Sequence, residues 1–221
     1  MDDTEVWAVV DRRRSAVADL LAGLTPSEWD TPSLCDGWRV RDVAAHLTIP
    51  LLTKPQLLGL ALRHPGGNNR LIRDGSLELA RRHTTDEIVA MIRRLVGVHR
   101  PIVPGMTPRE PLIDLIGHTF DIAVPLGRPV HVRPVEVAEA ADRVVSYRGR
   151  GKAKVFKRLP LAGVKLTATD HPWTTGDGPE VTGTMTDLFL LLTGRTARLG
   201  ELGGPGADDL REAVAASISP S

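Results

Sequence analysis

The sequence predicts an α+β protein in which a helical bundle, residues 1–130, precedes a smaller α+β domain, residues 131–221. Three observations lead to this prediction. Apolar residues recur at three- and four-residue spacing in several segments of the first part, which is typical of amphipathic helices. The second part adds a stretch of alternating apolar and polar residues, which is typical of a strand. A length of 221 residues is enough to bury a sizeable core.

Four helices are expected in the first part, each with one apolar face and turn-forming residues at its ends. They are residues 5–23, a long helix from Arg39 with a kink at Pro50 or Pro55, a helix after Thr84 that runs to Val98, and a helix from about Pro108 to Val124. Thr25 to Glu28 forms a capping box and predicts a short helical turn. Residues 30–38 and 64–69 are rich in turn formers and are expected to be loops. This pattern is typical of an antiparallel bundle.

The second part combines helices with strands. The expected elements are a helix over 134–147, a strand over 161–169, a turn over 173–179, a short strand over 181–183, a helix over 185–192 and a short helix after Gly203. The run from Tyr147 to Arg158 is basic, which also suits an anionic ligand or nucleic acid. It has few interleaved aromatic residues, so we expect an exposed loop.

The composition argues against several classes of protein, among them nucleic-acid-binding, membrane and disulfide-bonded secreted proteins. Hydrophobic residues make up 42% of the chain and charged residues 25%, as in ordinary globular proteins. A net charge of +1 gives no general attraction to nucleic acid or an anionic membrane. No apolar stretch reaches about 18 residues, and the acidic start Met1 to Glu5 does not resemble a signal peptide. With one cysteine, an intramolecular disulfide is excluded. We therefore expect a cytoplasmic protein.

The helix over 108–124 carries Asp114, His118 and Asp121 on one face. A carboxylate and an imidazole four residues apart can bind one metal ion. His46 lies among apolar residues in the second helix, where a neutral imidazole needs a hydrogen-bond partner, a carboxylate or a metal. His46, Asp114 and His118 together form a donor set of the catalytic type. The alternatives are a satisfied core histidine and carboxylates that face solvent or cap loop amides.

For the cysteine, three of the tryptophans and the other histidines we expect structural or surface positions. Cys35 has no histidine or acid beside it in the sequence, so we expect a loop or packing thiol. Trp29, Trp38 and Trp173 are expected to anchor the core or a domain interface, and Trp38 also suits a pocket entrance. The other histidines are expected at the surface: His64, His83, His99, His131 and His171.

Several stretches in both parts of the chain resemble, in family order, the maleylpyruvate isomerase family of mycothiol-dependent enzymes. They are LTPSEWDTPSLCDGWRVRDVAAHL at 24–47, DLIGHTFDIAVPLGR at 114–128, ATDHPW at 168–173, GDGPEVTG at 176–183 and LLTGR at 191–195. The resemblance implies a DinB-like four-helix bundle followed by a small α+β domain similar to sterol-carrier folds.

The resemblance also implies site residues. The family's first metal-binding histidine corresponds to His46, and its later carboxylate–histidine pair corresponds to Asp114 and His118. The family metal is usually zinc. Its carboxylate is Glu in the best-studied enzymes, and the Asp here is one methylene shorter, so a bridging water or Asp121 would have to compensate. Trp38 and Asp121 are assigned to the cofactor pocket.

Arg195 ends the last matching motif. The resemblance implies that it faces the site from the second domain and binds a substrate carboxylate. The alternative is an arginine that interacts with the dipole of the preceding helix.

The function implied is that of a mycothiol-dependent metalloenzyme, a transferase or isomerase, that acts on a small electrophile. Mycothiol is the small thiol of actinobacteria, and the excess of Arg over Lys is typical of high-GC bacterial genomes. One alternative is a non-catalytic DinB-like protein that binds a small molecule or a partner, which the Asp in place of Glu favours. Another is a metal-dependent hydrolase that needs no thiol.

Overall fold

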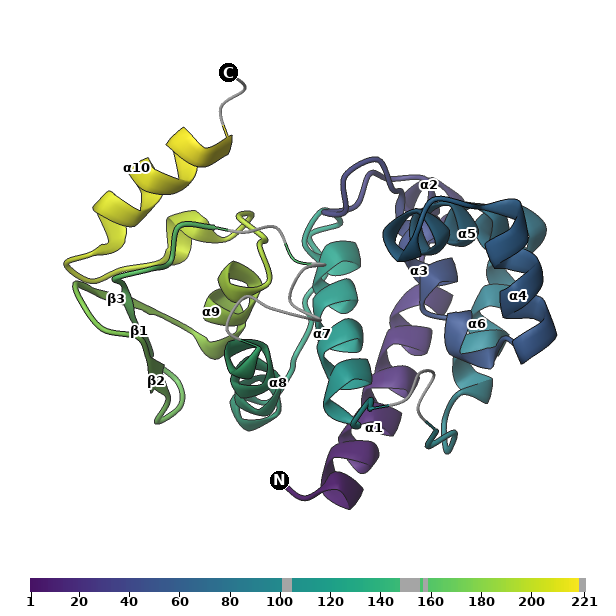
Figure 1. The fold of residues 1–221 in the computed structure, drawn as a ribbon, viewed down its shortest axis with the longest axis horizontal. Coiled ribbons are helices and arrows are strands. Elements are labelled where there is room, and N and C mark those ends of the chain that lie inside the picture. Colours follow the sequence, from purple (N-terminus) through teal and green to yellow (C-terminus); the bar gives the residue numbers. More distant parts are fainter. Residues whose placement is uncertain (101–104, 148–155, 157–158, 219–221) are drawn as a thin grey trace. The chain divides into compact units, whose positions relative to one another are not determined.

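The structure is a computed structural model that describes residues 1–100, 105–147, 156 and 159–218. It divides into unit 1, Met1–Val130, and unit 2, His131–Ser221. Helices predominate and one small sheet is present, so the predicted α+β class is confirmed (Figure 1). The basic run predicted as an exposed loop lies outside the described residues from Arg148 onward, apart from Phe156. Within the described ranges, no helix has the length and apolarity to cross a membrane.

Unit 1 consists of helices, in agreement with the predicted bundle. They are α1 (Asp3–Ala22), α2 (Pro26–Trp29), α3 (Val40–His46), a 3-10 helix (Ile49–Leu51), α4 (Lys54–Arg63), α5 (Asn68–Arg82), α6 (Thr85–Arg94) and α7 (Arg109–Ala123). The capping box predicted at Thr25 is present, and Thr84 caps α6 in the same way. Local capping chemistry therefore places these helix starts correctly.

The long second helix is a wrong prediction, because three short elements occupy its place. Helix α3 ends at His46, a 3-10 helix contains Pro50, and α4 begins after Thr53 with Pro55 in its first turn. Proline has no N–H to donate but is tolerated in the first turn of a helix. The two prolines therefore start new elements here and do not kink a continuous helix.

Helix α5 was not predicted, since its sequence is strongly polar and contains Gly75, an unfavourable residue inside a helix. The structure explains why glycine occupies position 75. A Cβ atom at Gly75 would lie 2.6 Å from the Leu60 Cδ2 atom, so a larger residue would push α4 away from α5. Tertiary packing thus overrides local helix propensity at this point.

The core of unit 1 brings α3 beside α7. Helix α1 packs against α6 and α7, and α3 packs against α5, α6 and α7. The two helices that carry the predicted ligands bury mainly aliphatic side chains, including Val40, Val43, Leu112, Leu115 and Ile116. This packing sets His46, at the end of α3, beside the middle of α7.

Unit 2 contains α8 (Pro134–Ser146), β1 (Lys165–Ala168), β2 (Thr174–Thr175), β3 (Glu180–Gly183), α9 (Met185–Leu192), a 3-10 helix (Leu199–Glu201) and α10 (Ala207–Ile218). The sheet order is β2-β1-β3, with β1 antiparallel to β2 and parallel to β3. Helix α9 packs against α8, β1 and β3. The predicted elements are confirmed with shifted ends, and the turn predicted over 173–179 includes strand β2.

Candidate metal centre

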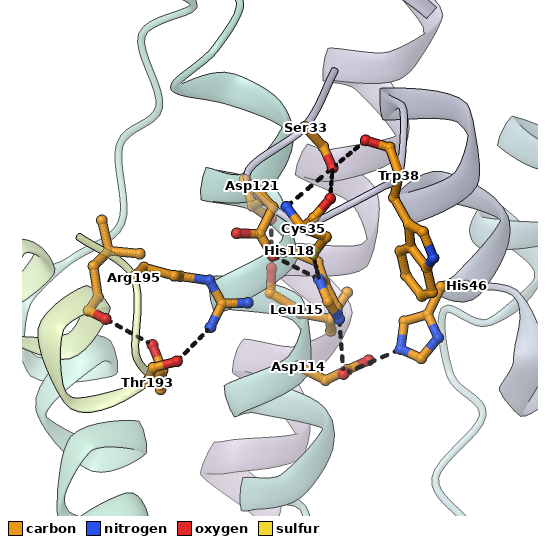
Figure 2. A network of polar contacts seen from close by, with 12 residues as sticks. Ser33, Cys35, Trp38, His46, Asp114, Leu115, His118, Asp121, Thr193 and Arg195 are labelled. Atoms are coloured by element: carbon orange, nitrogen blue, oxygen red, sulfur yellow. Dashed lines mark hydrogen bonds and ion pairs between the residues drawn. The ribbon is translucent and has the colours of Figure 1, made fainter. Parts of the chain in front are cut away.

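Three side chains of unit 1 converge between α3 and α7 (Figure 2). His46 is the last residue of α3, while Asp114 and His118 lie one turn apart on α7. The Asp114 Oδ1 atom lies 3.4 Å from His46 Nε2 and 3.4 Å from His118 Nε2. The two imidazole rings meet edge to face, with centroids 4.7 Å apart. One carboxylate oxygen therefore lies equally close to two ring nitrogens.

These separations suit a shared cation better than direct hydrogen bonds. An N–H···O hydrogen bond usually spans about 2.7–3.2 Å. Ligand atoms bound at about 2.0–2.1 Å to a tetrahedral metal lie about 3.3–3.4 Å apart, which is the separation at Asp114. Although Asp is shorter than Glu, its oxygen reaches both imidazoles. Two imidazoles and one carboxylate form a donor set that fits zinc.

His118 is held through its other ring nitrogen by Asp121. The Nδ1 atom lies 2.8 Å from Oδ2 of Asp121, whose side chain is fully buried. An ionised carboxylate only accepts hydrogen bonds, so Nδ1 carries the proton and Nε2 faces Asp114. A carboxylate in this position is the usual partner of a metal-bound histidine. Asp121 therefore orients His118 and lies outside the group formed by His46, Asp114 and His118.

His46 has a different partner. Its Nδ1 atom lies 3.2 Å from the Ser76 hydroxyl, which donates its own proton to the Ile72 carbonyl at 2.6 Å. The hydroxyl has one proton, so it accepts from His46 Nδ1–H, and Nε2 is the nitrogen that faces Asp114. Trp38, predicted for the cofactor pocket, packs against the same imidazole with ring centroids 5.6 Å apart.

Sequence reasoning missed Ser76 because α5 was not predicted. A signal was present: Ser76 lies four residues after Ile72 and three before Leu79. That spacing places it on the apolar, inward face of a helix. A hydroxyl on such a face needs a polar partner.

The metal-free site concentrates positive charge beside Asp114. Burial by itself raises the pKa of Asp114, but the charges of His46 and His118 outweigh it and hold that pKa well below its usual range. Burial lowers the pKa of His118, but Asp114, Asp121 and Cys35 together raise it well above its usual value. The raised pKa of His118 favours its protonated form in this state, so a metal ion must compete with that proton.

Cys35 lies in the loop between α2 and α3, as expected for a loop thiol, but it has an acid and a histidine beside it that the sequence did not indicate. Its Sγ atom donates to Asp121 Oδ2 at 3.1 Å and lies 3.8 Å from His118 Nδ1. Burial, opposed in part by His118, raises the pKa of the Cys35 thiol. Cys35, His118 and Asp121 form a second group of metal-ligand type. Its 2.8 Å nitrogen–oxygen separation is that of a hydrogen bond and is too short for two ligands of one ion.

Arg195 lies in unit 2, three residues after the end of α9. Its backbone N–H donates to the Leu190 carbonyl, and its Nη1 donates to the Thr193 carbonyl at 3.3 Å. Both acceptors belong to the end of the helix or to its cap. These contacts agree with the dipole interpretation of Arg195 and leave its proposed substrate role untested.

The structure also places the other tryptophans and histidines that the sequence singled out. Trp29, Trp38 and Trp173 are buried, as predicted. His64 is not simply a surface residue, because its Nε2 lies 2.6 Å from Glu78 of α5. The side chain of His99 stacks on Trp7 and pairs with Asp11. His99 is nevertheless exposed, as predicted. The absence of α5 from the prediction explains why the Glu78 partner of His64 was missed.

Comparisons with known proteins agree with this fold. Residues 10–115 match the family described as the mycothiol maleylpyruvate isomerase N-terminal domain. A crystal structure of a mycothiol-dependent maleylpyruvate isomerase shares 15% identity and a TM-score of 0.58 over 94% of both chains. A mutant of such an isomerase, with a histidine replaced by alanine, shares 14% identity and a TM-score of 0.59 over 94% of both chains. No curated protein sequence matches significantly.

At this identity the two solved structures show a shared fold over nearly the whole chain. The family match adds the N-terminal sequence, including His46 and Asp114, and ends three residues before His118. Unit 1 is therefore similar, over residues 10–115, to the family of mycothiol maleylpyruvate isomerase N-terminal domains.

Proposed function

We propose that unit 1 binds one divalent metal ion, zinc by its donor set, through His46, Asp114 and His118. We further propose that the chain is a mycothiol-dependent metalloenzyme, a transferase or isomerase, that acts on a small electrophile. One observation carries the metal site: the Nε2 atoms of two imidazoles lie 3.4 Å from the same carboxylate oxygen. The thiol and the reaction class rest on the family and on the names of the two similar structures.

A metal ion bound there supplies a positive charge that lowers the pKa of a bound thiol, and mycothiol supplies the nucleophilic sulfur. The chain's own residues prepare the donor set. Asp121 and Ser76 hold protons on the Nδ1 atoms, so both Nε2 lone pairs remain available. Three protein donors are typical of catalytic zinc sites, which keep a position for a further ligand.

The surroundings of the donors differ in their exposure to solvent. Trp38 packs on His46 and is almost completely buried, so it excludes water there. The Asp114 side chain is 42% exposed, so the carboxylate is accessible to a small molecule. In this proposal Arg195 binds a carboxylate of the substrate through its planar guanidinium.

The first test is metal analysis of the purified protein, its His46→Ala/His118→Ala variant and a His83→Ala control. His83 belongs to unit 1 but pairs with Glu87, away from the proposed ligands. We expect about one zinc ion per chain in the wild type and the control, as for a single tetrahedral site, and none in the double variant. A wild-type protein that contains no metal and takes up no added zinc would contradict the proposal and favour the non-catalytic binder.

The second test separates the reaction classes on the zinc-loaded protein. Turnover of an electrophile that requires mycothiol and returns it unchanged indicates an isomerase, whereas stoichiometric consumption of the thiol indicates a transferase. Metal-dependent turnover without any thiol would indicate the hydrolase and contradict the mycothiol proposal.

A further inference from the structure

The loop between α2 and α3, residues 30–39, contacts the surroundings of both proposed ligand histidines (Figure 2). Its Trp38 ring packs on His46, and its Cys35 thiol lies beside His118. The loop is closed at its base, where Val40 N–H donates to the Thr31 carbonyl at 2.9 Å. A closed loop of this kind holds its side chains in a defined position.

Backbone contacts then place Cys35. The Cys35 N–H donates to the Ser33 hydroxyl at 3.1 Å, and that hydroxyl lies 2.8 Å from the Trp38 carbonyl and donates to it. The next contact joins the loop to α7, because Leu34 N–H donates to the Asp121 carbonyl at 3.1 Å. Cys35 is therefore held against Asp121 before any interaction of its thiol is counted.

The thiol belongs to a network around the Asp121 carboxylate. Oδ2 of Asp121 receives the Sγ–H of Cys35 at 3.1 Å and the Nδ1–H of His118 at 2.8 Å. Since an ionised carboxylate only accepts, both neighbours must donate. Asp121 is fully buried, so solvent does not readily replace a lost donor. Two donors on one oxygen restrict rotation of the carboxylate and keep it directed at His118.

We infer that Cys35 is a positioning residue for His118. Its thiol holds the Asp121 carboxylate in the orientation that keeps the proton on His118 Nδ1 and directs Nε2 toward Asp114. This inference rests on the proposed metal site. It makes Cys35 a hydrogen-bond donor, and it assigns the thiol neither a nucleophilic role nor a place among the metal ligands.

The expected effect is smaller than that of losing Asp121 itself. Removal of a direct partner of a ligand histidine typically lowers metal affinity by about 10- to 100-fold. Cys35 acts one contact further away, and S–H is a weak donor, so we expect about 3- to 10-fold for its removal.

The metal-side experiment compares Cys35→Ala, Cys35→Ser and the wild type by zinc competition with a chelator, with folding checked by thermal unfolding. We expect weaker binding in the alanine variant and near wild-type binding in the serine variant, because a hydroxyl also donates. Equal affinities in all three proteins would overturn the inference. A thiolate charge-transfer band in the wild-type cobalt(II) protein, lost in the serine variant, would make Cys35 a ligand and would also overturn it.

The metal-free experiment does not depend on zinc binding. Proton–nitrogen NMR of the histidine rings measures how fast the His118 Nδ1 proton exchanges with water. We expect faster exchange in Cys35→Ala than in the wild type, with the slow rate restored in Cys35→Ser. Equal rates in the three proteins, or a wild-type Nδ1 without a proton, would overturn the positioning role. If the exchange rates behave as expected but the wild type binds no zinc, the proposed function is contradicted and the positioning role of Cys35 is not.

Discussion

The two proposed ligand histidines present the same nitrogen to Asp114 but are supported differently. His118 donates its Nδ1 proton to a buried carboxylate on its own helix, three residues away. His46 donates to a neutral hydroxyl on α5, thirty residues away in sequence. A charged acceptor binds an N–H more strongly than a neutral one. The comparison indicates that one ligand is held by local helical spacing, whereas the other depends on the packing of separate helices.

The largest effect on zinc affinity is expected from a change to Asp114, whose carboxylate lies beside both histidines. Asp114→Ala removes the carboxylate they share, and we expect zinc affinity to fall by more than about 100-fold, beyond the usual loss for an outer partner. Asp114→Glu retains the carboxylate and the family's usual residue, so we expect it to bind zinc measurably. Chelator competition on both variants checks this. Equal losses in the two variants would mean that the carboxylate charge is not what matters.

The next prediction compares the partners of the two histidines, Asp121 for His118 and Ser76 for His46. We expect Asp121→Asn to weaken zinc binding by about 10- to 100-fold. Ser76→Ala removes a neutral acceptor, and we expect a loss of only about threefold to tenfold, at the low end of that range. Zinc titration of the two variants under identical conditions ranks them. A larger loss in Ser76→Ala would reverse the proposed order of support.

The pH dependence follows from the raised pKa of His118 in the metal-free protein. A raised folded-state pKa contributes stability that is complete below the unfolded-state value, about 6.5, and is lost as pH rises through the folded-state value. Zinc binding has the opposite trend, because it releases protons. From neutral to alkaline pH we therefore expect the Tm of the metal-free protein to fall and the gain in Tm from zinc to grow. A gain that is independent of pH between 6 and 9 would contradict competition with protons.

The last effect concerns folding stability, with no direct change to the donor set, and it tests the packing that supports His46. Gly75→Ala places a Cβ atom 2.6 Å from Leu60 Cδ2, and we expect a loss of about 1–3 kcal/mol in unfolding free energy from the forced shift of α4 against α5. Gly59→Ala is the matched control on α4, where the added Cβ meets only the end of the Arg63 side chain at 3.2 Å. We expect the control to be neutral or stabilising by up to about 1 kcal/mol. Urea unfolding of both variants decides between strain and propensity.

Several parts of this site were accessible to sequence reasoning. The spacing of Asp114, His118 and Asp121 on one helix sets their relative positions, because α-helical geometry is regular. His46 was singled out from its apolar neighbours and from the resemblance. The network of Cys35 with Asp121 and His118 was not, since residues 35 and 121 are joined only by the packing of a loop on a helix.

By itself the sequence determined the local features: the capped starts of α2 and α6, the α+β class, and the placement of three titratable residues on one face of α7. Each depends on groups a few residues apart, for which backbone geometry is sufficient. Only the tertiary structure decided that α5 forms, that Gly75 admits Leu60, and that Ser76 and Cys35 reach the histidines. Those contacts join residues far apart in the chain, so they depend on how whole elements pack and leave little trace in any local pattern.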